Sequence, residues 1–109
     1  MTTLFDDRER AFENLFAHEE ALRFVALARR NKLIGAWMCD VLGLTGVRAE
    51  AYRQSLVAIG VRRISDGDLL DRLRADLAAG GADERIGDLP AVLARCAAQA
   101  ISEVRAGTT

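Results

Sequence analysis

Apolar residues recur at spacings of three and four along most of the chain, which is the period of an amphipathic α-helix. The longest such run predicts a helix from about Ala17 to Leu42, and Gly43 is suited to end it. This spacing aligns six residues in a stripe along one side of the helix, and Asn31 is the polar one among them. The members of the stripe are Phe24, Leu27, Asn31, Ile34, Met38 and Val41. We expect the stripe to face the core.

Three further helices follow the same period. The second covers about 47–59 after a Thr45 N-cap, and the third begins with the capping sequence of Ser65 and Asp68. Glycines then end the third helix at Gly80-Gly81. The residues that these patterns turn inward, together with those of the last helix, are Tyr52, Leu56, Ile59, Leu69, Leu70, Leu73, Leu77, Leu89, Leu93, Cys96 and Ala100.

The last helix covers about 88–105, with Pro90 in its first turn, where a missing N–H costs little. Residues 83–86 predict a short separate turn before it. No alternating strand pattern and no internal repeat is present. The predicted fold class is therefore all-α, a small four-helix bundle in which sequential helices pack antiparallel.

Residues 1–18 have a different pattern. Thr3 can cap a helix whose positive end meets Asp6 and Asp7, but the apolar side of this helix is thin. It consists of Phe5, Phe12 and Phe16, with Leu15 beside them. Two interpretations stay open: the segment continues the next helix and extends the core, or it is a mobile arm whose aromatic residues bind in a partner's groove. Ordering the arm costs more backbone entropy than its few apolar residues recover. We therefore divide the chain into an N-terminal arm, 1–18, and a helical bundle, 19–109.

Composition narrows the function. The 109 residues carry 15 Lys and Arg against 16 Asp and Glu, a net charge of −1, so no basic field attracts nucleic acid. No apolar run is long enough to span a bilayer, and the N-terminus lacks the pattern of a signal peptide. We expect a cytoplasmic protein without membrane insertion. Its two cysteines, Cys39 and Cys96, are expected to be buried free thiols.

The sequence contains no recognisable catalytic motif. We therefore expect that the protein is not an enzyme and that it binds no cofactor and no metal ion. The only histidine, His18, is followed by two acids but lacks the second histidine of a zinc motif. Its ordinary pKa near neutrality leaves a role as a pH sensor open. The glycines form no phosphate-binding loop. The basic cluster at residues 29–32 (Arg-Arg-Asn-Lys) is interpreted as a solvated face or as a source of salt bridges to a partner.

Several unusual blocks of sequence resemble one known family. They are Phe5-Asp-Asp-Arg-Glu-Arg-Ala-Phe-Glu13, Phe16-Ala-His-Glu-Glu20, Leu22-Arg-Phe24 and Ala28-Arg-Arg-Asn-Lys-Leu33, followed by Gly35 and Trp37. Shorter blocks extend the match: Leu42-Gly-Leu-Thr-Gly46, Ala49-Glu-Ala-Tyr52 and Leu73-Arg-Ala-Asp-Leu77. This sequence resembles the zeta-subunit family of alphaproteobacteria, the inhibitors of the F1F0-ATP synthase. It departs from the family at Leu15, Val25 and Leu27, at 59–63 and at Pro90.

The resemblance implies a four-helix bundle preceded by an inhibitory segment that becomes helical in a catalytic α/β interface of F1, near the central γ stalk. Carried onto this chain, the segment consists of Leu4, Phe5, Asp6, Asp7, Arg8, Glu9, Arg10, Phe12, Glu13 and Phe16. A free monomer that becomes peripheral to the inner membrane through F1 is expected. Two alternatives remain: a helical scaffold or homodimer that pairs through the 24–41 stripe, with Asn31 setting the register, and an adenine-nucleotide-binding module, for which no motif is present.

Overall fold

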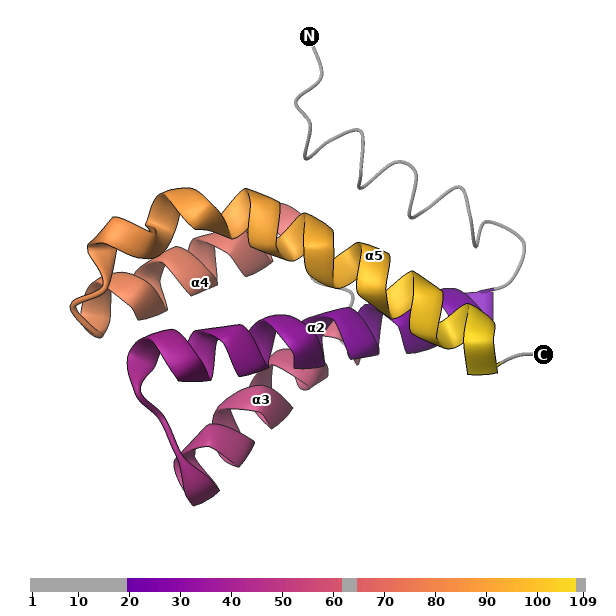
Figure 1. Ribbon diagram of the computed structural model, residues 1–109, viewed down its shortest axis with the longest axis horizontal. Helices are drawn as coiled ribbons and strands as arrows, with labels where there is room; N and C mark the ends of the chain where they lie inside the picture. The colour runs from indigo at the N-terminus through magenta and orange to yellow at the C-terminus, as the bar shows by residue number, and fades with distance from the viewer. Residues whose placement is uncertain (1–19, 62–64, 108–109) are drawn as a thin grey trace, which may run out of the picture.

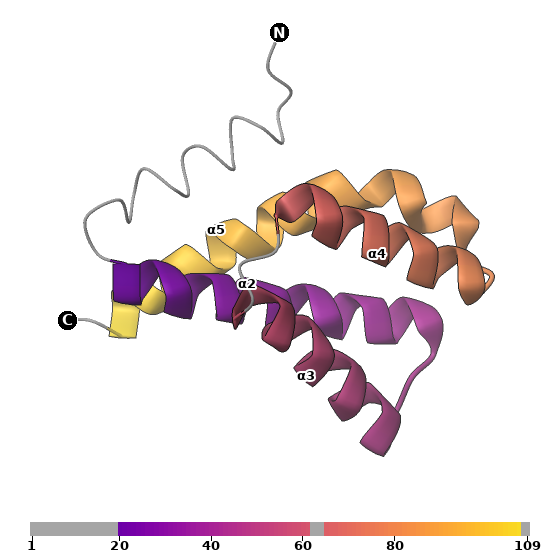
Figure 2. The ribbon, with the colours of Figure 1, turned by 180° about the vertical axis from the view of Figure 1, so that it is seen from behind.

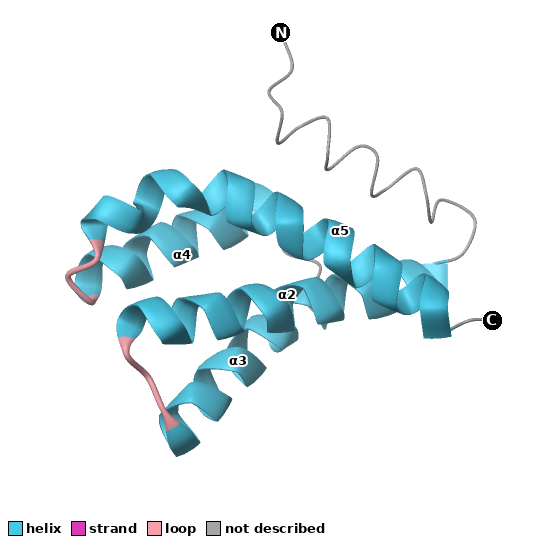
Figure 3. Ribbon diagram, viewed as in Figure 1, coloured by secondary structure: helices cyan, strands magenta, loops and turns pink. Residues whose placement is uncertain are grey.

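The computed structural model describes residues 20–61 and 65–107, and all regular structure within these ranges is helical (Figure 3). The α-helices are α2 (Glu20–Leu42), α3 (Gly46–Val61), α4 (Asp66–Ala79) and α5 (Leu89–Gly107), and a short 3₁₀-helix, η1 (Asp83–Asp88), precedes α5. The predicted all-α, four-helix fold is confirmed over these residues. The predicted short turn at 83–86 is η1.

Helix ends follow the local chemistry of the sequence. The Ser65 side chain accepts a hydrogen bond from the Asp68 N–H at 3.1 Å, so Ser65 is the N-cap of α4 as predicted. At the other end of α4, Gly81 adopts a φ of 74°, and the Ala82 N–H donates to the Leu77 carbonyl at 2.8 Å. This left-handed turn favours glycine because it has no Cβ. α3 ends at Val61, two residues later than predicted.

α2 is the central helix of the molecule. α3 runs antiparallel to it on one side, while α5 lies along it on another, and η1 and α4 close the far end (Figures 1 and 2). α3 approaches α2 closely at Gly35, where an added Cβ would lie 3.3 Å from the Arg53 Cα. The missing side chain at Gly35 thus lets the two backbones come together.

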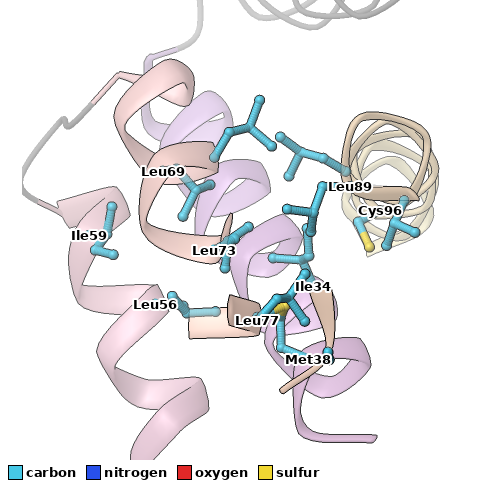
Figure 4. Packing of buried hydrophobic residues seen from close by; sticks show 13 residues of the cluster. Ile34, Met38, Leu56, Ile59, Leu69, Leu73, Leu77, Leu89 and Cys96 are labelled. Atoms are coloured by element: carbon cyan, nitrogen blue, oxygen red, sulfur yellow. The ribbon is translucent and has the colours of Figure 1, made fainter. Parts of the chain in front are cut away.

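The main core lies where all four helices meet. Figure 4 shows Ile34 and Met38 of α2 pointing toward Leu73 and Leu77 of α4, with Leu56 of α3 beside them. The buried residues of this cluster are Ile34, Met38, Leu56, Ile59, Leu69, Leu70, Leu73, Leu77, Ala82, Leu89, Val92, Leu93 and Cys96. Each large apolar side chain removed from water contributes about 1.5–3 kcal/mol. The predicted inward positions are confirmed, except that Tyr52 is only half-buried.

Candidate functional site

The residues predicted to act on a partner lie outside the described part of the chain. These are the ten residues of the inhibitory segment between Leu4 and Phe16, and the candidate pH sensor His18. What the structure describes is the end of the bundle to which this segment is attached. α2 begins there at Glu20, and α5 ends beside it at Gly107 (Figures 1 and 2).

This end of the bundle consists of α2 and α5 packed together. Ala26 and Val104 are buried between the two helices and form a cluster separate from the main core. The partly buried residues around the pair are Leu22, Leu27, Ala97 and Ile101. An ion pair between Arg29 and Glu103, 3.5 Å apart, adds a contact at the surface. Leu27, one of the departures from the family pattern, therefore packs within the chain.

The opposite side of α2 leaves large apolar groups in solvent. Phe24 is 38% exposed and Val25 is 46% exposed. With Ala21 and Ala28 they follow the helical spacing of three and four, and we call these four residues the Phe24 face. The expectation that the 24–41 stripe faces the core is therefore wrong at its first residue.

The position of α3 explains this exposure. Cys39 of α2 donates to the Ala49 carbonyl of α3, and Asn31 donates to the Leu56 carbonyl at 3.0 Å. α3 thus runs antiparallel to α2 and ends before it reaches the first turns of α2 (Figures 1 and 2). Phe24 lies beyond its reach.

Of the basic cluster, Arg29 and Lys32 are exposed as expected, but Arg30 belongs to a buried polar network. Arg30 is only 5% exposed, and its two terminal nitrogens each donate to an oxygen of Asp66 at 2.9 Å. Its Nε donates to the Asn31 side-chain oxygen at 3.1 Å. The sequence held a signal for this arrangement, because Arg30 is four residues from both Ala26 and Ile34 on the buried side of α2. The interpretation of Arg30 as a solvated residue was wrong.

The same network bears on the homodimer alternative. Asn31 is 1% exposed and its amide is bonded within the chain, while Ile34 and Met38 are fully buried in the core. The middle of the 24–41 stripe is therefore covered by the chain's own helices. It offers no seam for a coiled coil with a second copy.

Tyr52 forms a second polar cluster, between α3 and α4. Its hydroxyl donates to Asp76 at 2.7 Å, and the Arg72 guanidinium lies 5.8 Å from the centre of its ring. Arg72 also donates to the Ser55 hydroxyl at 2.9 Å. Burial, followed by the hydrogen bond to the Asp76 carboxylate, raises the pKa of Tyr52 well above its ordinary value of 10.0. The arrangement ties two helices together.

Chemistry-bearing groups do not gather elsewhere in the described ranges. Among residues 20–61 and 65–107, no three His, Cys, Asp or Glu side chains lie close enough to hold a metal ion. Cys39 and Cys96 are buried free thiols, as predicted, and burial raises the pKa of each. Over the same residues, no helix combines the length and apolar character needed to cross a membrane.

Fold and surface together define a small helical-bundle protein with its own core and an exposed apolar face where its N-terminal segment begins. A family model described as "ATPase inhibitor subunit zeta" matches residues 1–103. The chain belongs to this family. No curated protein sequence and no solved structure matches the chain.

Proposed function

We propose that this protein is a regulatory inhibitor subunit of a bacterial F1F0-ATP synthase that blocks ATP hydrolysis by the F1 sector. The observation that carries the proposal is the family match, which spans both the N-terminal segment and nearly all of the bundle. The protein would perform no chemistry itself. It would be cytoplasmic and would become peripheral to the membrane by binding F1.

The acting part is the N-terminal segment. Its capped, charged sequence carries three aromatic residues, Phe5, Phe12 and Phe16, at positions that align on one side of a helix. An amphipathic helix of this kind binds in an apolar groove between partner surfaces. Lodged at a catalytic interface between α and β subunits of F1, near the γ subunit, it would hold that interface partly closed and stall rotation in the hydrolysis direction.

The bundle supports this proposal as the folded carrier of the segment. The buried residues of its main core, over the described part of the chain, lie between Ile34 and Cys96, whereas the proposed inhibitory residues end at Phe16. The segment can be given up to a partner while the bundle stays folded.

The test is inhibition of ATP hydrolysis by F1 purified from the same source. The full chain is compared with a full-length variant carrying Phe5→Gln, Phe12→Gln and Phe16→Gln. Losing buried aromatic anchors is expected to raise the half-inhibitory concentration by about tenfold or more. The matched control is Val47→Gln, which replaces an apolar side chain 88% exposed on α3.

Circular dichroism and thermal melting establish that every variant is folded. The control is expected to inhibit as the unmodified chain does. Equal hydrolysis rates with and without the unmodified protein would refute the proposed function. Full inhibition by the triple variant would refute the role of the three phenylalanines.

A further inference from the structure

The Phe24 face carries the exposed large apolar residues at the attachment end of the bundle. Its members Phe24 and Val25 are two of the three large apolar residues exposed in the described ranges, and they are adjacent on α2. Residues two apart on a helix point to nearly opposite sides, so Phe24 points away from Ala26 and from α5, which packs over Ala26. α3 ends before this level (Figures 1 and 2). Phe24 and Val25 therefore stay partly exposed, although Ala28 is half-buried.

The nearest chain that could cover it is the protein's own N-terminal segment. Nineteen residues precede Glu20, where α2 begins, one residue from the first member of the face. If 3–16 form the helix that the sequence predicts, residues 17–19 remain as a connection. Three residues are enough to join two antiparallel helices.

Length and pattern fit this occupant. The stripe from Phe5 to Phe16 spans about 16 Å of helix, and so does α2 from Ala21 to Lys32. Laid back antiparallel, Phe16 would come to the level of Ala21, and Phe12 to the level of Val25. The residues from Phe12 to Phe16 then meet the Phe24 face, which is about 10 Å long, and Phe5 comes to the level of Lys32.

Charge complements the apolar match. The inhibitory residues between Leu4 and Phe16 contain four acids and two arginines, a net charge of −2. At the far end of the Phe24 face α2 carries Lys32, which is exposed. In the antiparallel arrangement Asp6 and Asp7 would lie near this lysine, where opposite charges attract.

We infer that the Phe24 face is an intramolecular docking surface for the N-terminal segment and holds back part of the inhibitor from F1. The regulatory consequence rests on the proposed function, whereas the docking itself does not. The capped, charged sequence of the segment favours a helix before docking, which lessens the entropy that docking costs. Because one face covers only one side of the segment, docked and released forms coexist. Only the released form is competent to bind F1, and the apparent affinity falls by the fraction that is released.

The functional test replaces the docking surface in the full chain, with Phe24→Gln and Val25→Gln together. Glutamine keeps helix propensity while it removes the apolar contact. The half-inhibitory concentration for F1 ATP hydrolysis is expected to fall about threefold, as when a segment docked two thirds of the time is set free. Val47→Gln is the matched control and should leave it unchanged. Unchanged or weaker inhibition by the double variant would overturn the inference, and weaker inhibition would mean that the face binds F1 instead.

A second measurement works without F1. Amide hydrogen exchange is followed along α2 in the full chain and in the variant with Phe12→Gln and Phe16→Gln. If the segment docks, losing its aromatic residues speeds exchange at residues 21–28 and leaves exchange at 34–39, in the core, unchanged. Equal exchange at 21–28 would exclude docking. Because this readout does not depend on inhibition, an inactive protein with altered exchange would refute the proposed function but not the docking.

Discussion

The pair of Arg30 and Asp66 permits a quantitative prediction about stability. The Arg30 side chain is 6% exposed and that of Asp66 is 14% exposed, with two parallel hydrogen bonds between them. Asp66→Ala leaves a buried guanidinium without its carboxylate, which costs about 3 kcal/mol. In a domain of this size the loss lowers the melting temperature by about 15 °C.

Removing the other partner should cost less. Arg30→Met keeps most of the buried volume and removes the cation, leaving a carboxylate in the first turn of α4, where the helix dipole favours negative charge. We expect a loss of about 1 kcal/mol. The double variant, Arg30→Met with Asp66→Ala, should be more stable than Asp66→Ala alone, because no buried charge is left unpaired.

Urea unfolding followed by circular dichroism measures these differences. Asp68→Ala is the matched control, since Asp68 is an exposed acid in the same turn of α4 and its removal tests the combined helix-dipole and capping contribution without a buried ion pair, about 0.5–1 kcal/mol. If Asp66→Ala is no more destabilising than Arg30→Met, the buried guanidinium does not need its partner and the reasoning fails.

Two further predictions follow from close packing and from burial. Gly35→Ala should destabilise the protein by about 1–2 kcal/mol because the added Cβ meets the α3 backbone. Gly67→Ala should stabilise it by about 0.5 kcal/mol, because the added Cβ meets only the Ser65 hydroxyl at 3.9 Å. Thermal melts in which Gly35→Ala is the more stable of the two variants would contradict this prediction. Tyr52, the only tyrosine, has a raised pKa in the folded state, so its contribution to stability is complete below pH 10 and is lost as the pH rises further. Its absorbance at 295 nm should therefore change only with unfolding, and an ordinary titration near pH 10 in the folded protein would refute this.

Local sequence chemistry was enough for the helices and for most of the core. The Ser65 cap, the glycine end of α4 and the spacing of the leucines predicted where helices lie and which sides face inward. These features depend on residues within one or two turns of each other, so a pattern along the chain records them. The observed end of α3 lies two residues beyond the predicted one, which is within the one or two residues by which assigned helix ends vary.

Less of the candidate site than of the fold could be predicted from the sequence. The sequence supplied the proposed inhibitory segment, 4–16, as a set of residue types and a resemblance to a family, and the family match supports the resemblance. It did not supply the Phe24 face. A hydrophobic residue in an amphipathic stripe is expected to be buried. Whether Phe24 is covered by α3 depends on where α3 ends, which the pattern along α2 does not show.

By itself, then, the sequence determined the helical character of this chain, the core side of each helix and the family to which it belongs. Periodicity, helix caps and long specific motifs all depend only on the order of residues along the chain. Tertiary structure alone decided that Arg30 pairs with Asp66 and that Phe24 is exposed. Both depend on partners distant in sequence: Asp66 lies 36 residues from Arg30, and α3 ends before it can cover Phe24. Such pairings are set by how helices pack, and the spacing within a single helix does not contain them.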